Sequence, residues 1–117
     1  MATKDPVKVL MIEHLLVPLD GSRLAEATLP AAISLAEPLR ARVTLLHVLE
    51  RRAPATIHGE RHLAVASEAE AYLNGVASRF AGAGVPVDTH VHPNPEGDVG
   101  ASIAAHAAEL GADLIVL

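Results

Sequence analysis

The sequence contains no cysteine and no tryptophan, and it has a single phenylalanine and a single tyrosine. The absence of cysteine excludes disulfide bonds and thiolate chemistry, and it is consistent with a reducing compartment. With so few aromatic side chains, the core must be built from Leu, Val, Ile and Ala. The same scarcity argues against a surface for single-stranded nucleic acid, because such surfaces stack bases on aromatic rings.

Basic charge and long apolar segments are also scarce. Nine Lys and Arg stand against fourteen Asp and Glu, which gives a formal net charge of −5. Binding to a phosphate backbone depends on a basic surface, so we expect no nucleic-acid partner. No apolar run reaches the roughly 20 residues that a membrane helix needs, and the N-terminus lacks the pattern of a signal peptide. We therefore expect a cytoplasmic protein with no membrane partner.

Length and apolar patterning indicate one α/β domain. A chain of 117 residues can bury roughly two thirds of its unfolded surface in a single core. We assign residues 1–13 to an N-terminal extension and residues 14–117 to the domain. Short apolar runs predict strands, and apolar residues at helical spacing predict helices. The strands fall at 15–19, 42–49, 85–92 and 113–117, and the helices fall between Ser22 and Pro38 and at 63–81 and 99–110.

Strands that alternate with helices predict an open, doubly wound sheet of parallel strands. The third strand alternates apolar and polar residues, which suits a sheet edge, whereas the first two are continuously apolar. We therefore predict the strand order 3-2-1-4. In such a sheet, ligands bind beyond the carboxyl ends of the strands, where the order reverses. The end of the first strand, residues 18–22, is thus the first candidate site.

Several local features are predicted from single residues. Ser22 and Asp98 are suited to be helix N-caps, because their side chains can accept a hydrogen bond from a free amide of the first turn. Pro30 is expected inside the first helix, where it would remove a backbone hydrogen bond and kink the helix. Residues 50–62 and 93–98 are predicted to be loops.

The last predicted strand ends in the apolar run 114–117. An apolar strand at a sheet edge is normally covered, charged or paired, so we expect something to complete the sheet. A continuation of the domain beyond this chain is the favoured explanation, which makes the domain truncated at its C-terminus. A strand of a partner subunit and the segment 7–12 are the alternatives.

With these residues in place, the chain resembles the universal stress protein family from Leu15 to Leu117. The resemblance is carried by Leu-Val-Pro-Leu-Asp-Gly-Ser at 16–22, Leu-Leu-His-Val at 45–48, Gly-Asp at 97–98 and Ala-Asp-Leu-Ile-Val at 112–116. It implies a five-stranded sheet of order 3-2-1-4-5, of which the fifth strand is missing here. It also implies a cytoplasmic role in the stress response and, commonly, a homodimer joined through the fifth strand.

The resemblance also implies a ligand, because some members of the family bind ATP. By similarity, Pro18, Leu19 and Asp20 line the adenosine pocket, and the backbone of Val48 faces the adenine. Those members hold the phosphates with a glycine-rich loop after the fourth strand, in a stretch that would follow Leu117. We therefore expect an adenine nucleotide (ATP or AMP) to bind when that loop is present, with magnesium only as an ion carried by the nucleotide.

Other interpretations stay open. Asp20 also suits a turn, where its carboxylate accepts hydrogen bonds from nearby backbone amides. A second hypothesis is a module that binds no nucleotide and acts by dimerising. A third is an ATP-dependent enzyme of the pyrophosphatase-loop type, with Ser-Gly-Gly-x-Asp-Ser after the first strand. Residues 19–23 lack those paired glycines, which let the backbone approach phosphate. We expect no catalytic residues and no enzyme, and leave only weak hydrolysis of bound ATP open.

Seven histidines raise the question of a metal site. His90 and His92 share one face of a strand, and His58 and His62 would be one turn apart if that segment were helical. The second pair lacks the His-Glu-x-x-His order of zinc proteases. We expect no metal site, and we expect His47, on a buried strand, to be a hydrogen-bonded core residue.

Overall fold

A sheet of four parallel strands lies at the centre of the computed structural model, which describes residues 12–50, 56–57, 60–61, 63 and 65–117. The strands run in the order β5-β2-β1-β6, which confirms the predicted order 3-2-1-4. The strands of this sheet are β1 (His14–Pro18), β2 (Arg42–Glu50), β5 (Val87–Glu96) and β6 (Leu114–Ile115). The helices are α2 (Arg23–Glu26), α3 (Leu29–Leu39), α4 (Ala66–Gly82) and α5 (Val99–Leu110).

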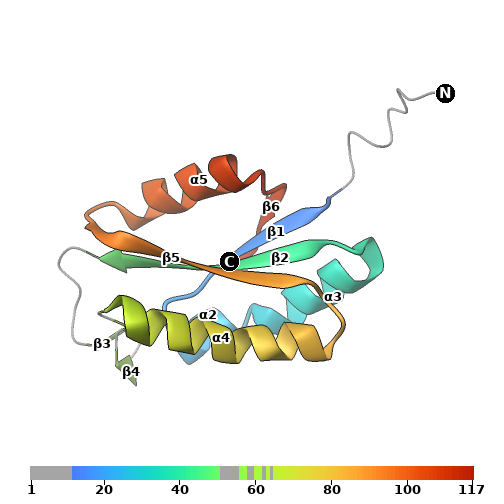
Figure 1. Cartoon of the computed structure of the whole chain (residues 1–117), viewed down its shortest axis with the longest axis horizontal. Helices are drawn as coiled ribbons and strands as arrows, with labels where there is room; N and C mark the ends of the chain where they lie inside the picture. Colours follow the sequence, from blue (N-terminus) through green and yellow to red (C-terminus); the bar gives the residue numbers. More distant parts are fainter. Residues whose placement is uncertain (1–11, 51–55, 58–59, 62, 64) are drawn as a thin grey trace.

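Helices cover both faces of the sheet (Figure 1): α3 and α4 lie on one face and α5 lies on the other. Successive side chains of a strand point to opposite faces. Leu15 and Val17 of β1 therefore pack against α3 and α4, while Leu16 packs against α5. All three are fully buried. This double cover explains why β1 is a continuous apolar run rather than an alternating one.

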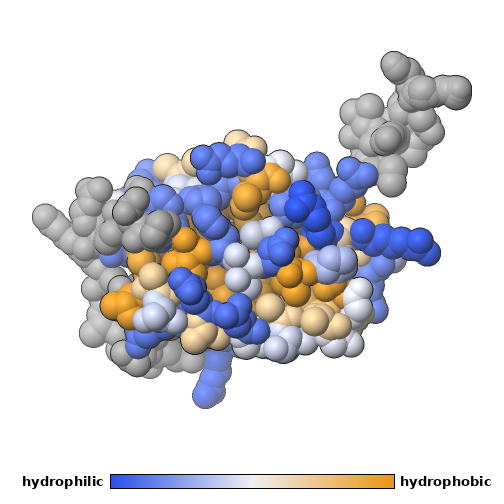
Figure 2. Space-filling view, viewed as in Figure 1, coloured by the Kyte–Doolittle hydropathy of each residue, from blue (hydrophilic) through white to orange (hydrophobic). Residues whose placement is uncertain are grey.

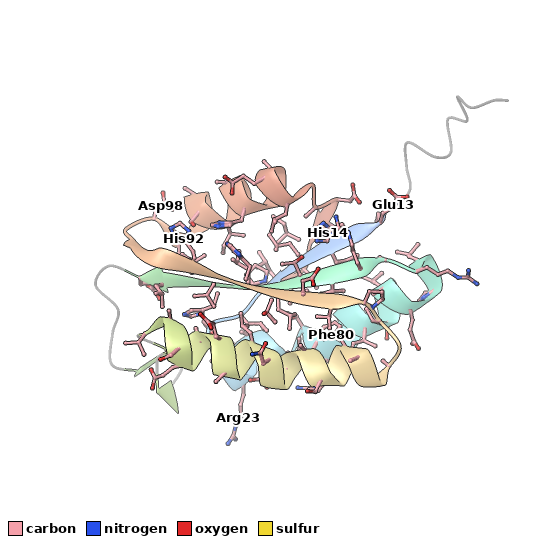
Figure 3. All side chains as sticks on the ribbon, in the orientation of Figure 1. Glu13, His14, Arg23, Phe80, His92 and Asp98 are labelled. Carbon is pink, nitrogen blue, oxygen red and sulfur yellow. The ribbon has the colours of Figure 1, made fainter. Side chains whose placement is uncertain are left out.

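The core is aliphatic, as the composition requires. Apart from Phe80, the buried hydrophobic residues among those described are Leu, Val and Ala. Phe80 is completely buried and points from α4 toward the sheet (Figure 3). On the face of the molecule seen in Figure 2, apolar residues gather in separate patches that polar side chains divide. None of the described helices is long and apolar enough to cross a membrane.

The expectation that Pro30 interrupts the first helix is wrong. The chain forms two helices there, and Pro30 is the second residue of α3. Proline is tolerated in a first turn because the amide that it lacks has no partner within the helix. The short helix α2 begins at the predicted cap, since Ser22 accepts a hydrogen bond from the backbone N–H of Ala25. Asp98 is likewise confirmed as a cap, because its side chain accepts from the N–H of Ala101.

Both predicted loops contain strand residues. β5 continues to Glu96, four residues beyond the predicted end, so the prediction of a loop at 93–98 is wrong for its first four residues. Prolines are tolerated there because β5 is an edge strand, where an unpaired backbone nitrogen costs little. In the stretch 50–62, a two-stranded antiparallel ribbon joins β3 (Thr56–Ile57) and β4 (Glu60–Arg61). Residues 51–55, 58–59 and 62 lie outside the described residues.

Strand β6 forms the other edge of the described sheet and pairs with β1. Ile115 packs against the α5 side and Val116 against the opposite side, so both faces of this segment are partly covered. Most of the expected extension, residues 1–11, lies outside the described residues, as does nearly all of the segment 7–12 that was considered as a cover for this edge.

Candidate functional site

A pocket of about 390 Å³ opens at the carboxyl ends of β1 and β2. The chain leaves β1 for β2 on one side and β6 lies on the other, so the strand order reverses at β1, where open α/β sheets bind ligands. A cavity of this size falls within the roughly 300–1,000 Å³ typical of small-molecule sites. Its lining comes from β1, β2, α2, α5 and the loops beside them: Pro18, Leu19, Asp20, Leu24, Ala25, Thr28, Leu46, His47, Val48, Glu50, Val99, Ile103 and Leu117.

The structure brings all four of the predicted site residues into this lining. Pro18 ends β1, and Leu19 and Asp20 follow it directly. Val48 comes from β2, three residues beyond the register partner of Val17. These residues meet because β1 and β2 are parallel neighbours, whose carboxyl ends lie at the same edge of the sheet.

Asp20 is held by the turn that leads into α2. Its Oδ1 accepts a hydrogen bond from the backbone N–H of Ser22 at 2.8 Å and from the Ser22 hydroxyl at 2.6 Å. The Ser22 oxygen in turn accepts from the N–H of Ala25 at 3.1 Å. The turn interpretation of Asp20 is therefore correct as geometry. It does not exclude a role in the pocket, because a carboxylate offers about four acceptor positions.

Gly21 makes this turn possible. Its φ of +90° lies in the region that side chains disfavour, and a Cβ there would stand 2.9 Å from Cγ of Leu63. Glycine avoids both the strain and the contact. The position of the Asp20 carboxylate thus depends on a glycine whose role is structural.

His47 holds the backbone of Leu19 in place by a hydrogen bond at the pocket. The Leu19 carbonyl lies 2.7 Å from Nδ1 of His47, and a carbonyl can only accept, so Nδ1 carries the proton. The Leu19 N–H donates to the Leu46 carbonyl at 2.8 Å. The expected hydrogen-bonded core histidine is confirmed, and it also lines the pocket, which the sequence did not indicate.

The chain matches the model of the Universal stress protein family over residues 11–117. The chain belongs to this family. A solved structure of a universal stress protein family member from Burkholderia pseudomallei is 27% identical, with the match covering 90% of this chain and 80% of that one at a TM-score of 0.66.

Two more distant solved structures share the fold of this universal stress protein. One is a universal stress protein in complex with cAMP, at 16% identity, 92% and 76% coverage and a TM-score of 0.68. The other is from Archaeoglobus fulgidus, at 20% identity, 93% and 76% coverage and a TM-score of 0.67. No curated protein matches the chain significantly in sequence.

The sequence did not indicate the residues that two helices contribute to the pocket lining. Val99 and Ile103 come from the first two turns of α5, and Leu24 and Ala25 come from α2. The available signal was topological: in an α/β sheet the helices that follow strands begin at the ligand edge. Of the described residues that line the pocket, two are acidic, Asp20 and Glu50, and none is Lys or Arg.

Helix α2, at the rim of the pocket, is tied to α4 in this universal stress protein. The Tyr72 hydroxyl donates to Oε2 of Glu26 at 2.6 Å, and Arg79 approaches Oε1 of the same carboxylate at 3.7 Å. Burial raises the pKa of Tyr72 far above its ordinary value, and the hydrogen bond to Glu26 raises it further. Tyr72 therefore stays protonated and keeps donating to Glu26 across the physiological pH range.

Within the described part of the chain, no three His, Asp or Glu side chains are arranged to hold a metal ion. His90 and His92 lie on the same face of β5, as expected, whereas His58 and His62 lie outside the described residues.

Proposed function

We propose that this universal stress protein is a stress-response module that binds an adenine nucleotide, ATP or AMP, in the pocket at the ends of β1 and β2. One observation carries the proposal. The four residues that the family resemblance implies, Pro18, Leu19, Asp20 and Val48, line a single cavity at the point where the strand order reverses. The complex of a universal stress protein of the same fold with cAMP supports the ligand class.

The chemistry of the lining suits the adenosine part of such a ligand. Leu46 and Val48 on one side and Val99 and Ile103 on the other offer apolar surface to a flat base. The carboxylate of Asp20 is an acceptor for a ribose hydroxyl, as acidic residues are at other strand ends. We expect the phosphates outside this cavity, because the described lining carries two carboxylates and no basic side chain. Magnesium would arrive only with the nucleotide.

Calorimetry tests the proposal on two proteins, this chain and a version extended beyond Leu117 by a glycine-rich loop and a fifth strand of the family type. We expect the extended protein to bind ATP with measurable heat and this chain to bind much more weakly. Asp20→Asn should reduce the affinity of the extended protein, whereas the control Asp88→Asn, on an exposed residue outside the pocket lining, should not. Absence of binding heat in both proteins would refute the nucleotide proposal.

A second function is favoured by the edge of the sheet. Among the described residues, β6 has a strand neighbour on the β1 side alone, and its residues Leu114 and Ile115 are half-buried. An edge of this kind suits pairing with another chain. The alternative is therefore an interaction module that binds no nucleotide and acts by dimerising. Analytical ultracentrifugation of the extended protein, together with the calorimetry, separates the two: a dimer without binding heat favours this alternative.

Location, assembly and activity follow the same proposal. We propose a cytoplasmic homodimer whose only enzymatic turnover is, at most, weak hydrolysis of bound ATP. Family membership supports the location and the assembly. The pocket supports a binding role, because its lining offers apolar surface and hydrogen-bond acceptors. Release of phosphate from ATP by the extended protein at an enzyme-like rate would contradict the proposal on activity.

A further inference from the structure

Histidines gather on the face of the sheet that α5 covers. His14 comes from β1, His90 and His92 come from β5, and His106 comes from α5 itself. Figure 3 shows His14 and His92 on this side of the sheet, near opposite ends of the helix. His14 and His106 are buried, and the other two are partly buried. The contact between a helix and the sheet that it covers is normally apolar, so four histidines in this contact are unusual.

Three of these rings touch, and we call His90, His92 and His106 the histidine cluster. The ring centre of His106 lies 4.9 Å from that of His90 and 5.0 Å from that of His92, in tilted and edge-on arrangements. Nδ1 of His106 donates to the Ser102 carbonyl at 2.8 Å, which fixes the ring on the helix. Packing of this kind favours neutral rings, because charged rings at such distances repel.

The histidine cluster adjoins the pocket. His92 is the register partner of Val48, and His106 follows Ile103 by one turn of α5. Val48 and Ile103 both line the cavity. The contact between α5 and the sheet is otherwise a small apolar group, in which Leu16, Leu46 and Val48 meet side chains of the helix. A change in the histidine cluster therefore acts on a limited interface.

We propose that the histidine cluster is a pH-sensitive latch: it holds α5 against the sheet when its imidazoles are neutral and loosens the helix when the solution becomes acidic. Where the proposed nucleotide site is correct, and in that respect the inference rests on it, loosening α5 also opens one wall of the pocket. The latch itself requires no ligand.

The direction of the pH dependence is set by how many protons the docked and the released helix each bind. Burial, followed by the charges that His106 and His92 can carry, lowers the pKa of His90 from its ordinary value of 6.5. The docked helix therefore binds fewer protons than the released one, and docking is fully stable above the ordinary pKa and weakens as the pH falls below it. A proton that His90 takes up only on release changes the docking equilibrium by up to about tenfold per pH unit.

Other charged groups on this interface modulate the latch. Glu109, on the same helix, opposes the lowering of the His90 pKa. His14 lies under the far end of α5, with Nδ1 3.2 Å from the Leu110 carbonyl and Nε2 2.7 Å from the Thr44 hydroxyl. Strand alternation places further charged residues on this face of the sheet; those described are Asp88, Arg42 and Glu50.

Hydrogen exchange on this chain without ligand tests the latch. Protection of the α5 amides, corrected for intrinsic exchange, is compared with that of the α4 amides from about pH 7.5 to about pH 5, on either side of the ordinary histidine pKa. We expect α5 to lose about tenfold or more of its protection relative to α4. Equal losses in the two helices, or no loss in α5, would overturn the proposal with the wild-type protein alone.

Variants separate the histidine cluster from general acid effects. The double variant His90→Gln with His92→Gln should largely abolish the difference between α5 and α4. Glu109→Gln should enlarge it, because the carboxylate that favours proton uptake by His90 is lost. Glu70→Gln, the control, removes a titratable group from an exposed position on α4 and should change nothing. Wild-type pH dependence in the double variant would overturn the assignment, whatever the result with nucleotide.

Discussion

Replacing Gly21 with alanine perturbs the turn that carries Asp20 into the pocket. Two costs combine at this position. The φ of +90° is strained for any residue with a Cβ, and the new Cβ would lie 2.9 Å from Cγ and 3.0 Å from Cδ1 of Leu63. Cγ is a branch point rather than a flexible end, so Leu63 or the turn has to move.

The chain offers two matched glycines that separate these costs. Gly84 has a φ of +79° and open space around its would-be Cβ, so Gly84→Ala should show the strain alone. Gly75 lies inside α4 with nothing within 4 Å and an ordinary φ, so alanine there should be favourable. We expect Gly21→Ala to cost about 3 kcal/mol of unfolding free energy, Gly84→Ala to cost about 1–2 kcal/mol, and Gly75→Ala to add about 0.5–1 kcal/mol.

Urea unfolding followed by circular dichroism measures all three variants on one scale. A domain of ordinary stability, about 5–15 kcal/mol, tolerates each of these changes. From most to least stable, the order should be Gly75→Ala, wild type, Gly84→Ala and Gly21→Ala. If Gly21→Ala is no less stable than Gly84→Ala, the contact with Leu63 costs nothing. If it equals the wild type, the described turn is wrong.

Further substitutions test the core, the α2 contact and the pH dependence. Phe80→Ala should lower the unfolding free energy by about 3–5 kcal/mol, because it empties the largest buried side chain; a loss under about 1 kcal/mol in urea would contradict the packing. Tyr72→Phe should cost about 1–3 kcal/mol through the lost bond to Glu26, and unchanged urea unfolding would show that this bond does not contribute. Overall stability should fall as the pH drops below about 6.5, because the His90 pKa is lowered in the folded state; a rise measured by thermal unfolding would contradict this.

The sheet was predictable because each of its inner strands is indicated by a short apolar run in the local sequence. The apolar run at 15–19 and the second strand at 42–49 are typical of strands in a sheet that is covered on both faces. The helix from Val99 to Leu110 was predictable for the same reason, since Asp98 caps its start and Gly111, with a φ of +70°, follows its end. These signals depend on neighbours in sequence alone.

Elements that depend on position in the fold were not predictable. The prolines after His92 indicate a loop in isolation, and the backbone is extended there because β5 is at the edge of the sheet. Pro30 indicates a kink in isolation. The helical backbone is interrupted before Leu29, however, so Pro30 lies in the first turn of a new helix.

The part of the candidate site at the strand ends was predictable, and the part contributed by α5 was not. Pro18, Leu19, Asp20 and Val48 were expected because strand ends and the family resemblance point to them, and they share one cavity. The opposite wall, made by Ile103 and its neighbours, depends on how α5 packs across the sheet. A side chain more than fifty residues away in sequence carries no local sign of that contact.

The most direct test of the account is a nuclear magnetic resonance titration of the extended protein with ATP, because it reports both binding and its location. We predict that the amide signals of Leu19, Asp20, Val48 and Ile103 shift together on addition of ATP, and that Asp20→Asn weakens the affinity by about tenfold or more. Shifts confined to other parts of the chain, or no shifts at all, would contradict the claim that this pocket binds an adenine nucleotide.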